Sequence, residues 1–304
     1  MSILPIALSQ IGARLFDTPA TLDKLIGVLQ EAGAAGARLI VFPEALLGGY
    51  PKGVDFGARV GSRSAEGREW FRRYHANAVE RDGPEIAALR EAVQAAGLYC
   101  VVGLIERAGG TLYCVAATLG PDGAILAWRR KLVPTAMERL IWGSGGPADL
   151  ACAATPWGNL SASICWENYM PLLRQHWYER QVALYCAPTV DDREAWLPSM
   201  RMIALEGRCF VLSACQYLLR SDAPADFHPI QGEAGDTVLI NGGSCVIGPL
   251  GEVIAAPVFG REALVLAELD LDAIPRAKFD LDVAGHYARP DLLRLGHCGQ
   301  KPMP

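Results

Sequence analysis

Thr155-Pro156-Trp157-Gly158-Asn159-Leu160-Ser161-Ala162-Ser163-Ile164-Cys165 is the stretch that decides the fold of this chain. A polar, turn-rich segment leads into a short apolar run that ends on Cys165, and residues 166–174 have the pattern of a turn and a helix start. Cys165 is therefore predicted where a buried strand stops and a helix begins. Ligands usually bind at this end of the strands in an α/β sheet, and helix N-terminal N–H groups lower a thiol pKa. The position suits a nucleophile.

A buried cysteine is more often structural than catalytic, and this alternative also applies to Cys165. The chain has nine cysteines. Without paired C-x-x-C spacing, this odd number speaks against a disulfide framework and a structural zinc site. Several other cysteines lie in apolar runs and are expected in the core: Cys100, Cys114, Cys186, Cys209, Cys215 and Cys245. Only chemical partners elsewhere in the chain can distinguish a catalytic Cys165 from these structural cysteines.

Length and composition indicate a globular protein with one substantial core. The chain has 304 residues, of which 51% are hydrophobic and 20% charged. No compositional break suggests a linker, so we expect a single domain over residues 1–304 with a short C-terminal tail from about residue 296. The net charge of −5 argues against a nucleic-acid partner. The N-terminus lacks signal-peptide features, and no apolar run approaches the ~18 residues of a membrane span, so we expect a cytoplasmic protein.

Strand and helix patterns alternate at both ends of the chain, with antiparallel hairpin signals between them. Expected strands are residues 3–10, 38–42, 98–105, 112–119, 124–130, 160–164, 182–187, 209–215, 243–248, 252–256 and 263–269. Expected helices are residues 22–32, 64–80, 84–96, 170–180 and 196–207, and residues 219–236 are expected to form a long polar loop. This order suggests a sandwich of mixed sheets covered by helices.

Three chemically different residues share one predicted place in the fold. Glu44, Lys131 and Cys165 each follow an apolar strand just before a turn. A cysteine that attacks an electrophilic carbon needs a base to accept its proton and a positive group to stabilise the charge that develops. Taken singly, Glu44 could cap a turn and Lys131 could be a solvated end of the cluster 129–131. Their coincidence at strand ends is more informative than any one of them, but spacing alone favours a catalytic site and separate solvated strand ends equally.

Three sequence blocks resemble the signature blocks of the nitrilase superfamily of carbon–nitrogen hydrolases. They are Phe42-Pro43-Glu44, the segment from Arg130-Lys131 through Glu138-Arg139, and Cys165-Trp166-Glu167-Asn168. The resemblance implies a four-layer αββα sandwich with two mixed sheets and a catalytic triad of Glu44, Lys131 and Cys165. It also implies a second active-site glutamate, Glu138. Cys-Trp-Glu resembles the nitrilase branch, whereas amidase and carbamoylase relatives more often have Cys-Tyr-Asp.

The resemblance predicts hydrolysis of an organic nitrile to a carboxylic acid and ammonia, with no metal and no cofactor. An amidase or carbamoylase of the same superfamily is the alternative within enzymes, and a non-catalytic binding or scaffolding subunit is the alternative from another class. Tyr50, Trp166 and Trp196 are candidate substrate-binding residues, although core packing explains such aromatic side chains almost as well. The apolar residues of 196–207 predict a homodimer or higher homo-oligomer. The short tail argues against long filaments.

Overall fold

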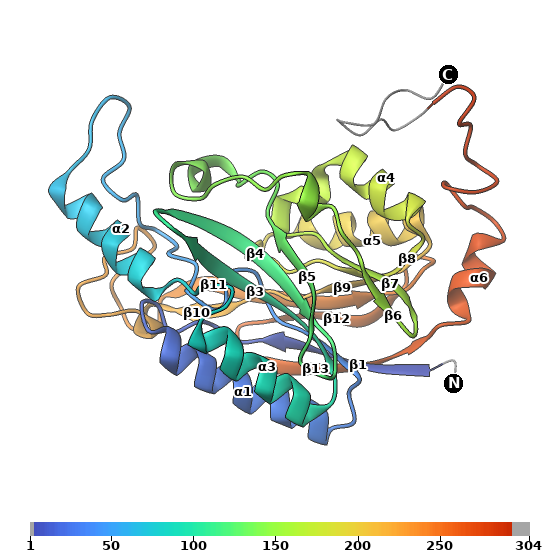
Figure 1. The fold of residues 1–304 in the computed structure, drawn as a ribbon, viewed down its shortest axis with the longest axis horizontal. Coiled ribbons are helices and arrows are strands. Elements are labelled where there is room, and N and C mark those ends of the chain that lie inside the picture. The colour runs from blue at the N-terminus through green and yellow to red at the C-terminus, as the bar shows by residue number, and fades with distance from the viewer. Residues whose placement is uncertain (1–2, 294–304) are drawn as a thin grey trace.

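Two β-sheets lie face to face between two layers of helices (Figure 1). The computed structural model describes residues 3–293. Within this range, one six-stranded sheet has the order β13-β1-β2-β3-β4-β5. A seven-stranded sheet has the order β10-β11-β9-β8-β7-β6, with β12 paired to β11. Both sheets contain parallel and antiparallel pairs. The predicted αββα sandwich with two mixed sheets is confirmed.

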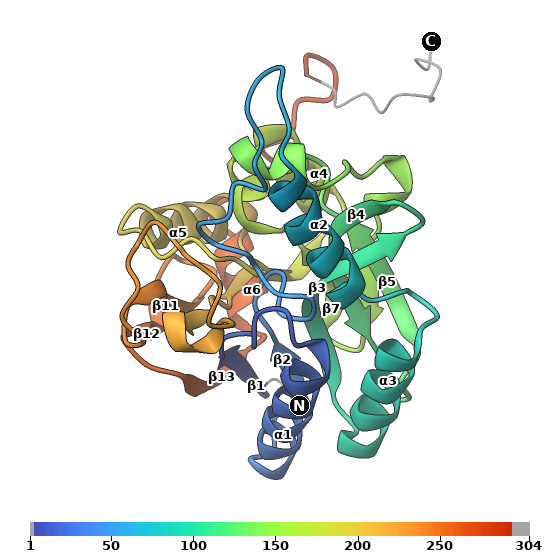
Figure 2. The same cartoon turned by 90° about the vertical axis from the view of Figure 1, so that its left-hand side faces the viewer.

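The first sheet is covered on its outer face by α1 (Thr18–Ala34) and α3 (Pro84–Ala96), which lie side by side (Figure 2). α1 begins after Asp17, whose carboxylate accepts the Ala20 N–H at 3.0 Å, and α3 ends at Gly97, where φ is +65°. The end of α3 lies where the sequence predicted it, whereas α1 extends past the predicted residues 22–32 at both ends. The strands of this sheet are β1 (Ile3–Gln10), β2 (Leu39–Val41), β3 (Tyr99–Ala108), β4 (Thr111–Leu119), β5 (Ile125–Arg130) and β13 (Ala263–Asp270).

The second sheet packs its outer face against α4 (Pro171–Glu179) and α5 (Trp196–Gly207). Side chains alternate between its two faces, because Phe210 and Leu212 join the core between the sheets whereas Val211 joins the core under these helices. The strands of this sheet are β6 (Ala153–Thr155), β7 (Gly158–Ala162), β8 (Val182–Cys186), β9 (Phe210–Ser213), β10 (Tyr217–Leu219), β11 (Val238–Ile247) and β12 (Val253–Phe259).

Two short strands and a short α-helix were not predicted, and each is too short for a periodic pattern to be visible in the sequence. β6 and β10 have three residues each and are held by pairing with β7 and β11. The short helix α6 (Ala273–Lys278) follows β13. The remaining α-helix, α2 (Ala65–Asn77), lies within the predicted helix 64–80. It begins after Ser64, whose hydroxyl oxygen accepts the Gly67 N–H.

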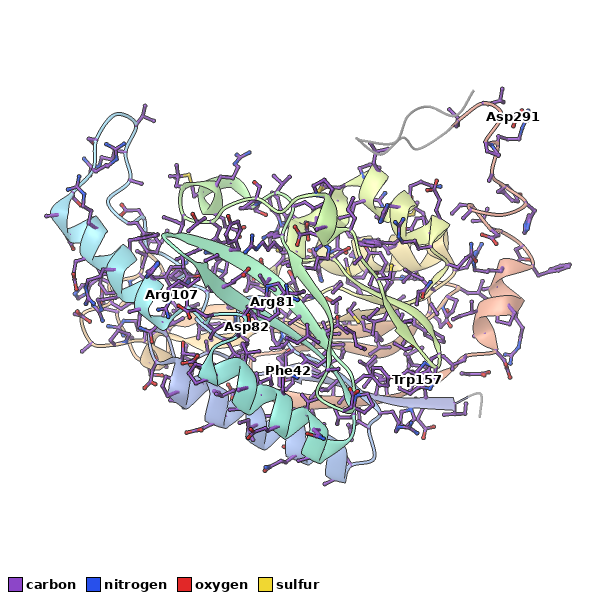
Figure 3. All side chains as sticks on the ribbon, in the orientation of Figure 1. Phe42, Arg81, Asp82, Arg107, Trp157 and Asp291 are labelled. Carbon is purple, nitrogen blue, oxygen red and sulfur yellow. The ribbon has the colours of Figure 1, made fainter. Side chains whose placement is uncertain are left out.

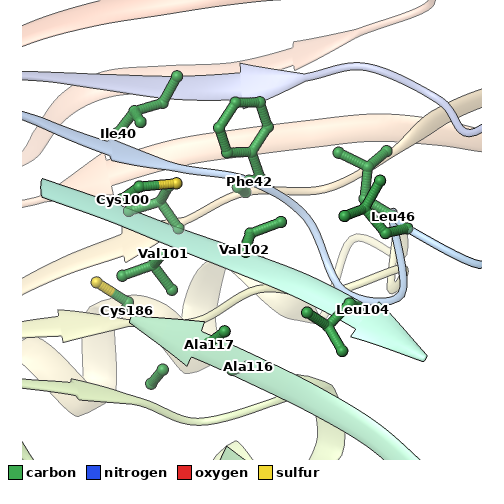
Figure 4. Close-up of a cluster of buried hydrophobic side chains, with 14 of the residues drawn as sticks. Ile40, Phe42, Leu46, Cys100, Val101, Val102, Leu104, Ala116, Ala117 and Cys186 are labelled. Atoms are coloured by element: carbon green, nitrogen blue, oxygen red, sulfur yellow. The ribbon is translucent and has the colours of Figure 1, made fainter. Parts of the chain in front are cut away.

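The main core lies between the sheets and joins residues far apart in the chain. In Figure 4, Cys186 of β8 lies close to Val101 of the facing sheet, and both belong to one buried cluster with Ala117 and Phe42. These side chains are fully or almost fully buried. Figure 3 shows Phe42 in this interior and Asp291 far away on the C-terminal segment. The tight core fixes where the strands end, and hence where the residues after them lie.

No helix within residues 3–293 is long and apolar enough to cross a membrane. The predicted tail from about residue 296 lies outside the described residues.

Gly103 of β3 lets the backbone that carries Glu44 pass unusually close to the sheet. Its N–H donates to Pro43 O at 3.1 Å, and its carbonyl oxygen accepts the Leu46 N–H at 2.9 Å. A Cβ added at Gly103 would lie 2.2 Å from Pro43 O and 2.5 Å from Glu44 Cα. Both contacts are with backbone atoms, which cannot rotate away. A side chain here would therefore displace Glu44.

We expect Gly103→Ala to lower the free energy of unfolding by about 1–3 kcal/mol, the usual cost of forcing extra atoms into a packed interior. Thermal or denaturant unfolding measures this change. Gly110→Ala is the matched control, because a Cβ there meets nothing within 4 Å. Equal stabilities of the two variants would contradict the close approach.

Candidate active site

Three buried strand ends meet at one edge of the sandwich. Glu44 follows β2, Lys131 follows β5, and Cys165 follows β7 and begins the short 3₁₀ helix η3 (Cys165–Tyr169). Glu44 and Lys131 come from one sheet and Cys165 from the other. Glu44 and Lys131 are fully buried, and Cys165 is 3% exposed. The structure thus brings the three residues of the predicted triad together.

Lys131 is the centre of this cluster. Its Nζ donates to Glu44 Oε1 at 2.7 Å and to Glu138 Oε2 at 2.8 Å, and it lies 5.6 Å from the centre of the Trp142 ring. Burial alone would lower the pKa of the ammonium, but the neighbouring acidic groups, Glu44 foremost, raise this pKa well above its ordinary value. Lys131 therefore stays charged and can stabilise a negative charge that forms beside it.

Glu44 is placed to act as a base. Its backbone oxygen accepts the Gln216 side-chain N–H at 2.7 Å, which fixes the residue from the second sheet. Burial raises the pKa of Glu44 to about 7; Lys131 lowers this pKa and Glu138 raises it. A hydrogen bond from the Cys165 side chain also lowers this pKa, and the second carboxylate oxygen, Oε2, has no donor from another described residue. Glu44 can therefore gain and lose a proton near neutral pH.

Glu138 is held more tightly than Glu44. It lies in the 3₁₀ helix η1 (Ala136–Leu140), where Oε2 also accepts the Thr135 N–H at 2.6 Å. Its other oxygen, Oε1, accepts the Tyr50 hydroxyl at 2.9 Å. Burial, followed by the charge of Glu138, raises the pKa of Tyr50, so this hydroxyl keeps its proton and donates it. Glu138 is thus fixed against Lys131 by donors on both oxygens.

Cys165 has a strained backbone, with φ at +50°. This left-handed conformation costs a non-glycine residue roughly 1–2 kcal/mol and is held by the Cys165 N–H, which donates to Pro188 O at 2.9 Å. Among residues 3–293, the next backbone N–H, that of Trp166, has no hydrogen-bond acceptor. It can therefore bind an atom that gains negative charge next to the sulfur.

The predicted lowering of the Cys165 pKa is wrong for the resting site. Burial, followed by the charge of Glu44, raises the pKa of this thiol well above its ordinary value, although Lys131 and a hydrogen bond from Thr189 lower it. The 3₁₀ turn after Cys165 is only five residues long and does not offset the burial. The thiol is therefore protonated at rest, and it needs a base to become a nucleophile.

Glu167 and Arg129 connect the two sides of the site and were missed by sequence reasoning. The Arg129 guanidinium donates to both oxygens of Glu167, at 2.7 and 2.8 Å. Glu167 also accepts the N–H of Leu132 at 2.6 Å and that of Ile164 at 2.8 Å. One buried carboxylate thus holds the residue after Lys131 and the residue before Cys165. The charges were visible in the sequence, but nothing there indicated that they pair.

A cavity of about 580 Å³ opens onto Cys165 and Glu138. The loop after β2 and the loop after β8 both line it. Tyr50 and Trp166 are in its wall, and the other lining side chains are mostly apolar: Val54, Phe56, Met137, Leu140, Ile141, Trp142, Val190 and Ile230. The cavity suits a small molecule with an apolar group.

Trp196 does not line this cavity. It is the buried first residue of α5, and its indole N–H donates to Ser213 Oγ at 2.8 Å. Its ring instead packs edge-on against Tyr169, which in turn contacts Trp166. Trp196 therefore supports the wall of the cavity from behind, a placement that its sequence neighbourhood alone did not reveal.

Within residues 3–293, no group of three or more His, Cys, Asp or Glu side chains is arranged to hold a metal ion.

Sequence comparison places this chain beside enzymes that act on carbon–nitrogen bonds. A family model described as carbon–nitrogen hydrolase matches residues 5–279. The chain is 52% identical over 279 residues to an aliphatic nitrilase of Sinorhizobium fredii, covering 92% of this chain and 90% of the relative. It is 48% identical over 290 residues to a bifunctional nitrilase/nitrile hydratase of Nicotiana tabacum, covering 94% and 83%.

Solved structures share the fold at low sequence identity. The NitFhit protein of C. elegans matches with a TM-score of 0.73 at 19% identity, covering 96% of this chain and 66% of that chain. A carbon–nitrogen hydrolase from Helicobacter pylori G27 matches with a TM-score of 0.69 at 18% identity, covering 91% and 93%. Both similarities support the sandwich architecture.

We expect Glu138→Gln to lower kcat by roughly 10²-fold, the scale of acid–base and positioning groups, because the amide carries no charge to hold Lys131. The melting temperature should fall much less than kcat, since Glu44 still pairs with Lys131 and the side chain keeps its size and shape. Glu106→Gln is the matched control, because Glu106 forms a half-buried ion pair with Arg130 at 2.7 Å outside the site. Wild-type kcat in Glu138→Gln would remove this residue from the catalytic machinery.

Proposed function

The chain belongs to the carbon–nitrogen hydrolase family, in its nitrilase branch, and we infer that it hydrolyses an organic nitrile to a carboxylic acid and ammonia. We assign this chemistry to Cys165, Glu44 and Lys131, with Glu138 as a fourth member of the site. The observation that carries the assignment is that Cys165 lines the cavity, while the base Glu44 and the ammonium of Lys131 are buried beside it and hydrogen-bonded to each other. Relatives at 52% and 48% identity that are named nitrilases support the substrate class.

The first stage joins the nitrile to the enzyme. Glu44 takes the proton of the Cys165 thiol, and the sulfur attacks the nitrile carbon. One π bond of the nitrile breaks, its electron pair moves to nitrogen, and nitrogen receives the proton from Glu44. The product is a thioimidate. Lys131 and the Trp166 backbone N–H stabilise the charge that develops on nitrogen.

The second stage uses two molecules of water. Glu44 removes a proton from the first water, which adds to the thioimidate carbon and gives a tetrahedral intermediate. The nitrogen takes the water proton from Glu44 and then, again through Glu44, the proton of the new hydroxyl group. The C–N bond breaks, ammonia leaves, and the C=O bond of a thioester forms. A second water, again activated by Glu44, releases the carboxylic acid, and Cys165 recovers its proton. Loss of sulfur instead of ammonia from the tetrahedral intermediate would release an amide.

Tyr50 and Trp166 are the proposed substrate-binding residues. The Tyr50 hydroxyl is committed to Glu138, so its ring offers mainly an apolar surface to the cavity. Trp166 is 41% exposed, with its indole N–H held by Asp191 at 2.8 Å. Two fixed aromatic walls and apolar neighbours favour an aliphatic or aryl substituent on the nitrile.

Cys165→Ala should abolish nitrile turnover and preserve the fold, because it removes the nucleophile but little core volume. The assay measures ammonia release from a panel of aliphatic, aromatic and arylacetonitriles, each beside its amide. Cys100→Ala is the control, because Cys100 is buried in β3 within the core between the sheets. Ammonia release by folded Cys165→Ala would end the assignment. Turnover of amides alone would favour the amidase or carbamoylase alternative, and absence of both activities would favour a binding subunit.

We propose that the protein is cytoplasmic and forms a homodimer or a higher homo-oligomer. Eight cysteines of the described part are free thiols, which suits a reducing compartment. α5 buries Met200 and Ile203 in its own subunit but leaves Met202 52% exposed. Leu172 of the neighbouring α4 is 68% exposed. Exposed apolar side chains on two neighbouring helices are suited to pairing with a second copy across a two-fold axis.

Light scattering at micromolar concentration should give at least twice the 32.7 kDa of the single chain. Met202→Glu should reduce the mass, because it places a charge in the proposed interface. Val60→Glu is the control, since Val60 is fully exposed on a distant loop. A wild-type mass of one chain would reject the oligomer.

A further inference from the structure

Thr189 lies against the sulfur of Cys165. It follows β8, and its backbone N–H donates to Ala214 O at 2.9 Å, which ties the loop to the segment after β9. The side chain is fully buried, and its Oγ1 lies 3.2 Å from Cys165 Sγ. A hydroxyl with one rotatable proton therefore contacts the reacting atom directly.

A second hydrogen bond fixes the direction of the Thr189 proton. Oγ1 accepts the Asp191 N–H at 2.9 Å, so one of its lone pairs is occupied. A hydroxyl has one proton to donate, and the sulfur is the acceptor that the structure gives it. A neutral thiol is a weak acceptor, whereas hydrogen bonds to a charged atom are roughly twice as strong as neutral ones. The contact therefore strengthens when the thiol becomes a thiolate.

Hydrogen bonds from Cys165 and from the next residue, Trp166, hold the loop that carries Thr189. Pro188 O accepts the Cys165 N–H at 2.9 Å. Asp191 accepts the indole N–H of Trp166 at 2.8 Å and is paired with the Arg193 guanidinium. The hydroxyl thus reaches the sulfur from a fixed position, without the entropy cost of ordering a mobile side chain.

We propose that Thr189 is a further catalytic residue, whose hydroxyl donates a hydrogen bond to the thiolate of Cys165. The proposal rests on Cys165 as the nucleophile of the function proposed above. The hydroxyl acts twice in each turnover. It stabilises the thiolate when Glu44 takes the thiol proton, and it stabilises the same thiolate when the C–S bond of the thioester breaks and its electron pair returns to sulfur. No proton is transferred from Thr189 in either step.

Stabilising a thiolate has two opposing effects on the rate, and their sizes decide the outcome. Each unit by which the thiol pKa falls raises the thiolate fraction about tenfold at a pH below the pKa. The same unit lowers the intrinsic nucleophilicity only about threefold, since the Brønsted coefficient is roughly 0.4–0.5. Cys165 starts with a raised pKa, so the gain in thiolate outweighs the loss. Departure of the sulfur from the thioester also becomes faster.

The test is the pH dependence of Cys165 alkylation by iodoacetamide in the full-length protein, measured by mass spectrometry of the peptide that contains it. Thr189→Val keeps the shape but removes the hydroxyl. We expect it to move the midpoint of alkylation upward by roughly one to two pH units, the scale of a hydrogen bond to a charged group, and to lower kcat for a nitrile about tenfold or more. Thr189→Ser keeps the hydroxyl and should restore both values. Thr118→Val, at a buried threonine of β4, is the matched control.

Several outcomes would overturn the proposal. A Thr189→Val midpoint equal to that of the wild type would show that the hydroxyl does not stabilise the thiolate. An alkylation rate that Thr189→Val lowers equally at every pH, and that Thr189→Ser does not restore, would indicate a packing role only. If Thr189→Val fails to fold, Thr189→Ala is compared with Thr189→Ser in the same way. Alkylation needs no nitrile, so a shifted midpoint in a protein without nitrile turnover would reject the proposed function and leave the Thr189 contact standing.

Discussion

A buried ammonium between two carboxylates is the interaction on which the site depends. An unpaired charge in a protein interior is strongly unfavourable, so the fully buried Lys131 requires Glu44 and Glu138 at hydrogen-bonding distance. Much of the surrounding structure serves to hold these three groups. Gly103 admits the backbone of Glu44, and the Thr135 N–H fixes Glu138. Loss of any of these contacts would move Glu44 or Glu138 and leave the buried charge of Lys131 without one of its partners.

The two carboxylates differ in their surroundings, and the difference suits different roles. Glu138 has donors on both oxygens, whereas among residues 3–293 the Oε2 atom of Glu44 has no donor apart from the neighbouring Cys165 thiol. The pKa of Glu44 is raised to about 7, first by burial. Glu44 can therefore carry a proton between the thiol, the nitrile nitrogen and water, while Glu138 keeps Lys131 in position. This division resembles the general rule that environment, not residue type, separates the acid from the base.

The sequence predicted much of the fold and the residues at the centre of the site. Apolar runs mark strands, and the residues that follow these strands lie at the edge of a sheet. Glu44, Lys131 and Cys165 could be found in this way. Contacts that depend on the paths of the loops could not be predicted. Glu167 belongs to the sequence block that begins at Cys165, yet its pairing with Arg129 depends on how the two sheets align. Thr189 gave no signal at all, since a threonine after a strand is common.

The central claim is that Cys165 forms a covalent bond to the nitrile carbon while Lys131 and Glu44 complete the site. The most direct measurement is rapid acid quenching of the enzyme during turnover of a nitrile, followed by mass spectrometry of its peptides. The account predicts a thioimidate or thioester adduct on the peptide that contains Cys165, and no adduct on peptides with the other cysteines. Continued turnover with an unmodified Cys165 at every quench time, or an adduct on a different cysteine, would contradict it.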